Sequence, residues 1–236
     1  PNLPAMVGYP LAQRLAAACG APVALENDAN LYALGEHRFG AGRGVDDLIC
    51  FTLGTGVGGG LILGGRLVVG SLGCGGEIGH TLVEPGGRLC GCGARGCLEA
   101  YASATGLVGV LDEALAAGHP TRLRPGDGVR AMDLAAQAGD ALAVELFHQA
   151  GLMLGRALAN LVALTGLDLA IVGGGVAKGW GLMEPGCRAA LADRLCIVEA
   201  GRVRIVAAAL GQEAPLLGAA AFAQTTLGSQ PAHRPA

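Results

Sequence analysis

Two kinds of apolar patterning alternate along the chain, and each predicts a different element. Short, mostly apolar runs at 48–53 and 167–172 predict buried strands, because each run is followed directly by glycine. By contrast, Leu154, Leu158 and Leu161 recur at helical spacing, which predicts a long amphipathic helix. Strands that alternate with helices in this way are typical of an α/β fold.

The other predicted elements follow from the same patterns and from glycine and proline positions. We expect helices over 10–19, 29–38, 98–117, 139–165, 181–195 and 213–225. We expect further strands over 22–25 and 202–207, and a β-hairpin that turns at Gly64-Gly65. Irregular stretches are expected at 71–97 and 119–130, with a frayed tail over 226–236. No internal repeat is visible.

Composition excludes several classes of protein. The chain has 236 residues, of which 52% are hydrophobic and 15% charged, so a disordered chain is excluded. The formal net charge is −3, so the chain lacks the excess of positive charge that binds a nucleic-acid backbone. No nucleic-acid partner is therefore expected in this segment. The most apolar stretch, 157–177, contains Asp168 and a run of glycines, which favours a buried helix and strand over a membrane span.

Localisation and completeness are predicted from the chain ends and the cysteines. The first residues lack a secretory signal, and the eight cysteines lack the spacing of a small disulfide framework. Both observations favour a reducing cytoplasm. The chain begins at Pro1 without an initiator Met, so we expect a fragment of a longer protein.

A cluster of cysteine and histidine is the most specific chemical signal. Cys90, Cys92 and Cys97 follow one another closely, and His80 precedes them. Three thiolates and one imidazole form a tetrahedral zinc set, and the intervening glycines let the backbone fold around one ion. Cys74 is a rival ligand at a greater distance. Ordinary buried cysteines are the alternative, and an RNA-binding zinc knuckle is a weaker one because no aromatic residue lies in the cluster.

Glycine-rich segments follow two of the predicted strands. The segment from Gly54 to Gly60 matches the dinucleotide pattern G-x-G-x-x-G, but it leads into a strand and not a helix, so a dinucleotide site is rejected. Its backbone N–H groups and the Thr55 hydroxyl can still cradle a phosphate, with a plain tight hairpin as the alternative. Gly173 to Gly175 permits close approach to a nucleotide, with a sharp turn as the alternative.

Acidic and amide side chains form a candidate sugar site. Asn27 and Asp28 precede a predicted helix, and Glu77, His80 and Glu99 flank the cysteine cluster. Carboxylates and an amide can hold vicinal hydroxyls, and one carboxylate can accept the proton of a hydroxyl nucleophile. A helix N-cap is the alternative for Asp28, and solvated surface acids are the alternative for Glu77 and Glu99.

Together these segments resemble the ROK family (repressors, open reading frames and kinases), and within it the bacterial glucokinases. The resemblance covers about residues 1–225 and rests on ENDAN (26–30), FTLGTGVGGG (51–60), GGEIGH (75–80), CGCGARGCLEA (90–100) and IVGGGVAKG (171–179). It implies the actin-like ATPase (ribonuclease H-like) fold, in which two α/β domains surround a cleft. It also implies that ATP, with Mg²⁺, phosphorylates a hexose at the 6-hydroxyl, with glucose favoured.

The resemblance implies a role for each matching position. Asp28 would be the catalytic base. The sugar hydroxyls would be held by Asn27, Glu77, His80 and Glu99. A structural Zn²⁺ would be held by His80, Cys90, Cys92 and Cys97. The nucleotide would contact Gly54, Thr55, Gly56, Gly58, Gly173, Gly174 and Gly175.

The chain departs from the family pattern at its start. The Asp-x-Gly-x-Thr-like phosphate loop of the amino-terminal domain is absent from the sequence. We therefore expect a remnant of that domain over 1–26, the carboxyl-terminal kinase domain over 27–210 with a zinc loop at 74–99, and a closing helix over 211–225 that packs on the first domain. We expect a homodimer, and we do not expect this stretch alone to be active.

Other functions stay open from the sequence. A kinase for N-acetylmannosamine, N-acetylglucosamine or fructose is the alternative among enzymes. A sugar-sensing transcriptional repressor of the same family is the alternative from another class. Asp28 and the Gly-Thr-Gly turn favour a kinase, because a sensor needs no base. A stand-alone zinc module does not explain ENDAN or GTGVGGG.

Overall fold

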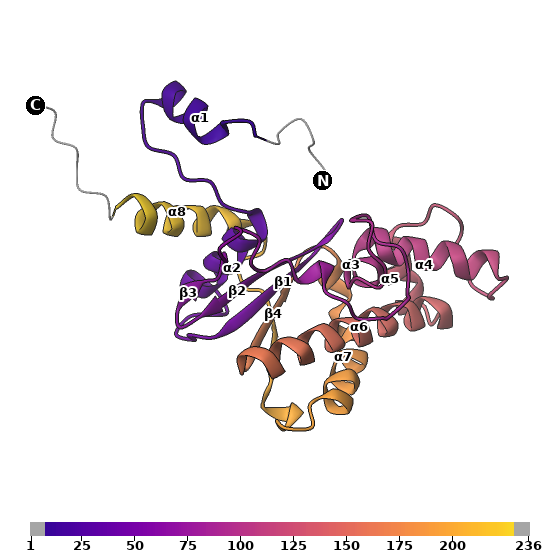
Figure 1. Cartoon of the computed structure of the whole chain (residues 1–236). Helices are drawn as coiled ribbons and strands as arrows, with labels where there is room; N and C mark the ends of the chain where they lie inside the picture. Colours follow the sequence, from indigo (N-terminus) through magenta and orange to yellow (C-terminus); the bar gives the residue numbers. More distant parts are fainter. Residues whose placement is uncertain (1–7, 229–236) are drawn as a thin grey trace, which may run out of the picture.

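The computed structural model describes residues 8–228, and its strands form one mixed sheet at the centre of the molecule (Figure 1). Within residues 8–228 the sheet has five strands in the order β3-β2-β1-β4-β5. The strands are β1 (Leu48–Leu53), β2 (Val57–Leu63), β3 (Arg66–Leu67), β4 (Leu169–Gly173) and β5 (Arg204–Ala207). An antiparallel meander (β1 to β3) and a parallel set (β1, β4 and β5) meet at β1.

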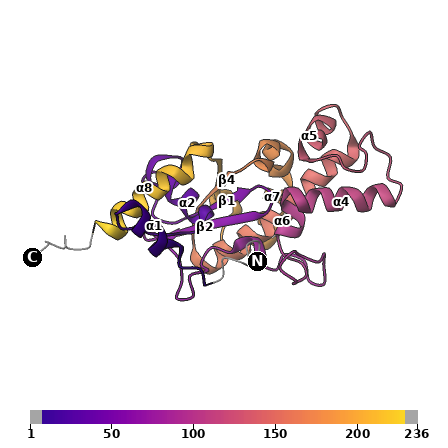
Figure 2. The same cartoon turned by 90° about the horizontal axis from the view of Figure 1, so that it is seen from above.

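Helices cover both faces of this sheet. The helices are α1 (Leu11–Cys19), α2 (Asp28–Phe39), α3 (Glu99–Ala102), α4 (Ala104–Ala116), α5 (Val129–Gln137), α6 (Ala141–Thr165), α7 (Trp180–Arg194) and α8 (Ala214–Leu227). α2 and α8 lie on one side of the sheet, while α6 and α7 lie on the other (Figure 1), and α4 and α5 lie at the opposite end of the molecule from α8 (Figure 2). Among the helices of residues 8–228, none combines the length and apolarity that a membrane span requires.

The burial of β1 on both faces explains its largely apolar sequence, in which the one polar residue, Thr52, is also the one that is not fully buried. Ile49, Phe51 and Leu53 belong to the core cluster that packs with α6 and α7, while Leu48 and Cys50 belong to the cluster beneath α2. Successive strand residues point to opposite faces, so two cores require apolar residues at successive positions. The strand predicted over 48–53 is confirmed.

Glycines allow the helix pairs to approach closely. A side chain at Gly151 of α6 would collide with the carbonyl of Met183 in α7. Likewise, a side chain at Gly218 of α8 would collide with the carbonyl of Leu31 in α2. α8 therefore packs on α2 of its own fold. That α8 also packs on a further domain stays a prediction.

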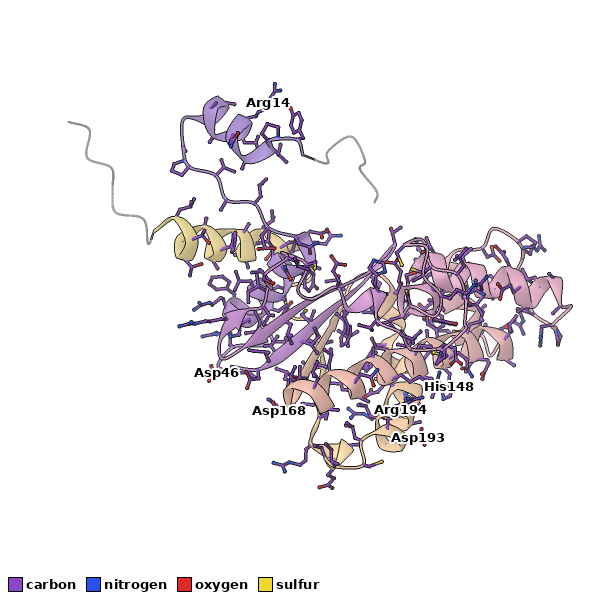
Figure 3. All side chains as sticks on the ribbon, viewed as in Figure 1. Arg14, Asp46, His148, Asp168, Asp193 and Arg194 are labelled. Atoms are coloured by element: carbon purple, nitrogen blue, oxygen red, sulfur yellow. The ribbon has the colours of Figure 1, made fainter. Side chains whose placement is uncertain are left out.

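α1 stands apart from the sheet (Figure 1), and no residue of it is buried. Figure 3 shows Arg14 on this outlying helix, and its guanidinium lies 5.3 Å from the centre of the Tyr9 ring. The assignment of residues 1–26 to another domain stays a prediction, and residues 1–7 lie outside the described part of the chain. The tail predicted at 226–236 also lies mostly outside it, since α8 continues to Leu227.

Most predicted elements are confirmed with small shifts of their ends, but others are wrong. The strand predicted over 22–25 is wrong, because these residues pair with no strand of residues 8–228. The helix predicted over 98–117 is two helices, because Ser103 has extended backbone and caps α4: its Oγ accepts a hydrogen bond from Gly106 N at 2.9 Å. The loop predicted over 119–130 ends at Gly128, the N-cap of the unpredicted α5, which begins at Val129.

The sheet order places two glycine turns side by side. β1 and β4 are parallel neighbours, so their carboxyl ends open at the same edge of the sheet. The turn 54–56 follows β1, and Gly174 and Gly175 follow β4. In open α/β sheets, ligands bind at this edge.

Candidate active site

A cleft of about 580 Å³ opens at this edge of the sheet. Its walls come from the start of α2, the β1–β2 turn, the segment before α3, and the end of β4. The lining includes Asn27, Asp28, Thr52, Gly54, Thr55, Gly56, Gly58, Glu77, His80, Cys92, Glu99 and Gly174. The structure thus brings the predicted base and all four predicted sugar ligands to one cleft, although they lie far apart in the sequence.

Asn27, and not Asp28, is the N-cap of α2. Asn27 Oδ1 accepts hydrogen bonds from Ala29 N at 2.8 Å and Asn30 N at 3.2 Å. Asp28 is the first helical residue, and its Oδ1 accepts a hydrogen bond from Ala29 N at 2.9 Å. The capping alternative for Asp28 is therefore wrong. Asp28 is exposed on the wall of the cleft.

The cysteines are brought together by a tight turn. Cys90 N donates to Ala94 O at 2.8 Å, and Gly93 N donates to Cys90 O at 2.9 Å. Gly93 has a φ of 92°, a conformation that side-chain-bearing residues rarely adopt. Gly96 also has a positive φ, and a side chain there would collide with the carbonyl of Glu84. The turn that brings the cysteines together therefore requires glycine at both positions.

The ligand atoms of His80, Cys90, Cys92 and Cys97 all lie within 4.8 Å of one another. Cys92 Sγ lies 3.7 Å from Cys97 Sγ, and Cys90 Sγ lies 3.7 Å from His80 Nδ1. A tetrahedron with Zn–S bonds of about 2.3 Å has edges of about 3.8 Å, so the group has the size that a zinc ion requires. Cys74, the rival ligand, is exposed and lies outside this group.

The thiols of the group differ in acidity. Burial raises the pKa of Cys97 to about 12 and also raises the pKa of Cys90. Conversely, hydrogen bonding to the backbone N–H of Ala94 lowers the pKa of Cys92. Zinc binds thiolates, so a bound cation would supply the charge that the buried thiols need to ionise. Metal binding here should release protons and strengthen as the pH rises.

His80 connects this group to the cleft. It ends a short 3₁₀ helix (Ile78–His80), and its Nδ1 faces the Cys90 thiol. On the other side of the ring, His80 Nε2 lies 4.0 Å from Glu77 Oε2. A metal ion bound to Nδ1 would hold the ring and leave Nε2 available to a ligand in the cleft.

Glu99 also lines the cleft. Its Oε2 accepts a hydrogen bond from Val57 N at 3.0 Å, and its Oε1 accepts one from Cys90 Sγ at 3.7 Å. Glu99 begins α3 directly after Leu98, which follows the metal-ligand candidate Cys97. One carboxylate therefore contacts both the cysteine group and the start of β2.

The glycines predicted to contact a nucleotide fall into two groups. No atom of the described residues lies within 4 Å of a Cβ built at Gly54 or Gly175, and neither has a positive φ. The fold therefore does not require glycine at these two positions. At the others a side chain would collide with a neighbour: Gly56 with Glu99, Gly58 with Thr52 and Ala29, Gly173 with Tyr32, and Gly174 with the Leu53 backbone.

The sequence did not indicate the residues that border these turns. Thr105 Oγ1 donates to Thr55 O at 2.8 Å, and Ala104 N donates to Gly54 O at 2.8 Å, so the start of α4 lies against the first turn. The serine before α4 is a capping signal that could have located this helix start. Beyond the second turn, a pocket of about 480 Å³ is bordered by residues of α5 together with Gly175, Lys178 and Gly179.

The model of the ROK family matches residues 1–226, so this chain belongs to the ROK family. It is 37% identical over 235 residues to a glucokinase of Thermotoga maritima, a match that covers 97% of this chain and 74% of that protein. It is 35% identical over 225 residues to an N-acetylmannosamine kinase of Escherichia coli, covering 94% of this chain and 72% of that protein.

Solved structures of the family have the same fold. A ROK hexokinase of Thermus thermophilus aligns with a TM-score of 0.80 at 39% identity, covering 94% of this chain and 72% of that one. A Streptomyces griseus glucokinase in complex with glucose and AMPPNP aligns with a TM-score of 0.76 at 40% identity, covering 92% and 72%. A ROK transcriptional regulator, a homologue of an E. coli protein, aligns with a TM-score of 0.82 at 30% identity, covering 91% and 55%. The predicted actin-like ATPase fold is confirmed.

Proposed function

We propose that this chain carries the sugar-binding and catalytic part of an ATP-dependent hexose kinase that phosphorylates glucose at the 6-hydroxyl. The observation that supports this most strongly is the arrangement of one cleft: Asp28 shares it with Glu77, His80 and Glu99, beside the turn 54–56. The glucokinase relatives support glucose, and the related structure with bound glucose and AMPPNP supports ATP as phosphoryl donor.

Asp28 is the proposed general base. Asn27 caps α2, so the Asp28 carboxylate is not needed for the helix and can accept the 6-hydroxyl proton as that oxygen attacks the γ-phosphate. A positioned base of this kind contributes roughly 10²–10⁴-fold to a rate. The other residues of the cleft would then hold the 6-hydroxyl in line with the γ-phosphate that it attacks.

The other hydroxyls of the sugar are assigned by donor and acceptor capacity. Glu77 and Glu99 carboxylates accept hydrogen bonds from hydroxyls. Asn27 Oδ1 already serves two backbone N–H groups, so Asn27 acts on the sugar through its Nδ2 as a donor. His80 contributes Nε2, the ring nitrogen that lies nearer to Glu77.

A structural Zn²⁺ at His80, Cys90, Cys92 and Cys97 is part of the proposal. The chemistry that the ion supplies is cross-linking: four ligands from two segments become one rigid unit. The chain's own residues then hold the sugar, because Glu77 and His80 lie on the same short segment and Glu99 follows Cys97 closely. Holding these groups in place before binding lowers the ordering cost of binding.

ATP, with Mg²⁺, is proposed to bind across the two glycine turns. The backbone of turn 54–56 and the Thr55 hydroxyl face the phosphates, and the amino end of α4 adds its partial positive charge nearby. The nucleoside end occupies the pocket beside Gly175, where Leu134 of α5 offers an exposed apolar surface. Open space at Gly54 and Gly175 supports close approach of the ligand to the backbone.

Two rival functions have specific support. The 35% identity to an N-acetylmannosamine kinase supports an amino-sugar substrate. The TM-score of 0.82 to a transcriptional regulator supports a sugar sensor. The exposed Asp28 at the cleft wall favours a kinase over a sensor, and the glucokinase relatives favour glucose over the amino sugar. The homodimer and the cytoplasmic location stay predictions.

A coupled ADP-release assay of the full-length protein tests the proposal. Glucose, N-acetylmannosamine, N-acetylglucosamine and fructose are compared by kcat/KM, and the position of the phosphate is read by ³¹P and ¹³C NMR. We expect glucose to have the highest kcat/KM, with the phosphate on the 6-oxygen. Preference for N-acetylmannosamine would identify the amino-sugar kinase. No turnover of any sugar, together with sequence-specific DNA binding, would identify the repressor.

A further inference from the structure

A small polar pocket of about 80 Å³ adjoins the cleft. It lies between the start of α2 and the glycine-rich segment that leads to Glu77. Its lining is Asn27, Asp28, Ala29, Asn30, Gly58, Gly59, Gly73, Gly75, Gly76 and Glu77. Asn27, Asp28 and Glu77 line both spaces, so a ligand held in the main cleft reaches the mouth of the small pocket.

Asn30, which lines this pocket, has an amide with a defined orientation. Its side chain is 2% exposed, and its Nδ2 donates to Glu26 Oε1 at 2.9 Å. Glu26 Oε1 also accepts a hydrogen bond from Asn27 N at 2.9 Å. A carboxylate only accepts, so the NH₂ group of Asn30 must face Glu26 and the carbonyl oxygen must face the other way.

That carbonyl oxygen has no hydrogen-bond partner among the described residues. Asn30 Oδ1 is buried, and a Cβ placed on Gly76 would lie 3.2 Å from it. Buried acceptors are almost always paired, so an unpaired one that lines a polar pocket calls for a donor from outside the described residues, either water or a ligand hydroxyl. Gly76 has a φ of 90°, and the Cβ that it lacks would crowd both Asn30 Oδ1 and the carbonyl oxygen of Gly59.

We propose that Asn30 is a further sugar-binding residue, whose Oδ1 accepts a hydrogen bond from a hydroxyl of the bound hexose that enters the small pocket beside Asp28. The inference rests on the proposed function, since the main cleft must bring a hexose to this place. It gives the two asparagines of segment 26–30 opposite roles. Asn27 donates because the helix cap occupies its oxygen, and Asn30 accepts because Glu26 occupies its NH₂ group.

The inference is tested by a thermodynamic cycle in which the Asn30 side chain and one sugar hydroxyl are removed separately and together. Glucose and its 1-, 2-, 3- and 4-deoxy analogues are titrated calorimetrically against the full-length wild-type protein and Asn30→Ala. For one analogue, we expect the wild type to lose about 3- to 10-fold in affinity relative to glucose while Asn30→Ala loses almost nothing further. The 6-deoxy analogue is titrated in the same way, because Asp28 also lines the small pocket. If each of the five deoxygenations weakens both proteins by the same factor, Asn30 does not contact a hydroxyl and the inference is overturned.

A second variant and a second measurement keep the test independent of folding. Asn30→Leu preserves the volume, and its unfolding temperature without sugar reports whether the fold is intact. A crystal structure of the wild type with glucose gives the direct answer: a sugar oxygen within hydrogen-bond distance of Asn30 Oδ1 supports the inference, and a water there that no sugar hydroxyl contacts overturns it. If the protein phosphorylates glucose but the effects of Asn30→Ala and of each deoxygenation simply add, only this inference is overturned. If the protein neither binds nor phosphorylates any hexose, the proposed function is overturned as well.

Discussion

Glu99 and Val57 are joined by a hydrogen bond that links two walls of the cleft. Val57 N donates to Glu99 Oε2 at 3.0 Å across 42 positions of sequence. Val57 begins β2 directly after the turn 54–56, and Glu99 begins α3. The other oxygen of this carboxylate accepts a hydrogen bond from Cys90 Sγ. One side chain therefore contacts both the cysteine group and the first residue of β2, directly after the turn that we propose to face the phosphates.

Glu99→Ala should therefore impair both substrates. Losing a charge-assisted hydrogen bond costs about 1.5–3 kcal/mol, so we expect the KM for glucose and the KM for ATP each to rise by about tenfold or more. Glu99→Gln is the matched control, because its amide oxygen can still accept from Val57 N; its KM for ATP should stay near the wild-type value. Steady-state kinetics decide: a change confined to glucose in Glu99→Ala would mean that the link to the turn has no effect.

Cys92→Ser should remove the metal and weaken sugar binding together. A hydroxyl is a poor zinc ligand, and without the ion the positions of His80 and Glu77 are no longer restrained. We expect loss of bound zinc by elemental analysis and at least about a tenfold rise in the Kd for glucose. Cys74→Ser is the control, since Cys74 is exposed outside the ligand group, and it should keep both. Normal glucose binding by metal-free Cys92→Ser would refute the coupling.

Two adjacent glycines allow the fold and the ligand to be tested separately. Gly175 has room for a Cβ, so Gly175→Ala should leave the unfolding temperature unchanged and yet raise the KM for ATP by roughly fivefold, about 1 kcal/mol, because the methyl group enters the nucleotide site. Gly174 has a φ of 95° against the Leu53 backbone, so Gly174→Ala should lower the stability itself. An unchanged KM for ATP in Gly175→Ala would place the nucleotide elsewhere.

Asp140 stabilises the start of α6 with an ionised carboxylate. Its oxygens accept hydrogen bonds from Arg122 N at 2.7 Å, Thr121 Oγ1 at 2.9 Å and Ala143 N at 3.0 Å. Burial alone would raise the pKa of Asp140, but these hydrogen bonds outweigh it and hold the pKa below its usual value. The charged carboxylate is therefore the form that the folded protein prefers.

The stability contributed by Asp140 should depend on pH in a defined direction. Because the pKa is lower in the folded state, the contribution is complete above the unfolded pKa of about 3.9 and disappears as the pH falls through the folded pKa. We expect Asp140→Asn to lower the free energy of unfolding by about 1–2 kcal/mol at pH 7, with a smaller difference from wild type below about pH 4. Urea unfolding at both pH values measures this, and a difference that stays constant would contradict it.

The sheet was predictable where burial alone decides the structure. β1 and β4 are buried on both faces, so their mostly apolar sequences indicate directly that they are core strands. Residues 22–25 have a similar composition, but a strand also needs a neighbour with which to pair, and that depends on tertiary contacts. α5 was missed for the opposite reason: its buried residues are Met132 and Ala136 alone, too few to reveal a helical period beside a loop rich in proline and glycine.

The candidate site was predictable where its residues lie close in the sequence. The cysteines needed only one turn to meet, so their spacing indicated a metal-ligand group. The N-cap was assigned one residue too late, because asparagine and aspartate are equally good caps and only the backbone distinguishes Asn27 from Asp28. The orientation of the Asn30 amide depends on Glu26 and on the packing of Gly76, and no linear pattern records it.

Replacement of one carboxylate by an amide addresses the central claim, that Asp28 takes the proton of the attacking hydroxyl. Asp28→Asn preserves the shape of the side chain and removes its basicity. In the full-length protein, kcat with glucose and the Kd for glucose are measured for this variant and for the wild type. We expect kcat to fall by about 10²–10⁴-fold while the Kd changes by no more than a few-fold. A variant that binds glucose normally and keeps kcat within a few-fold of wild type would contradict the account.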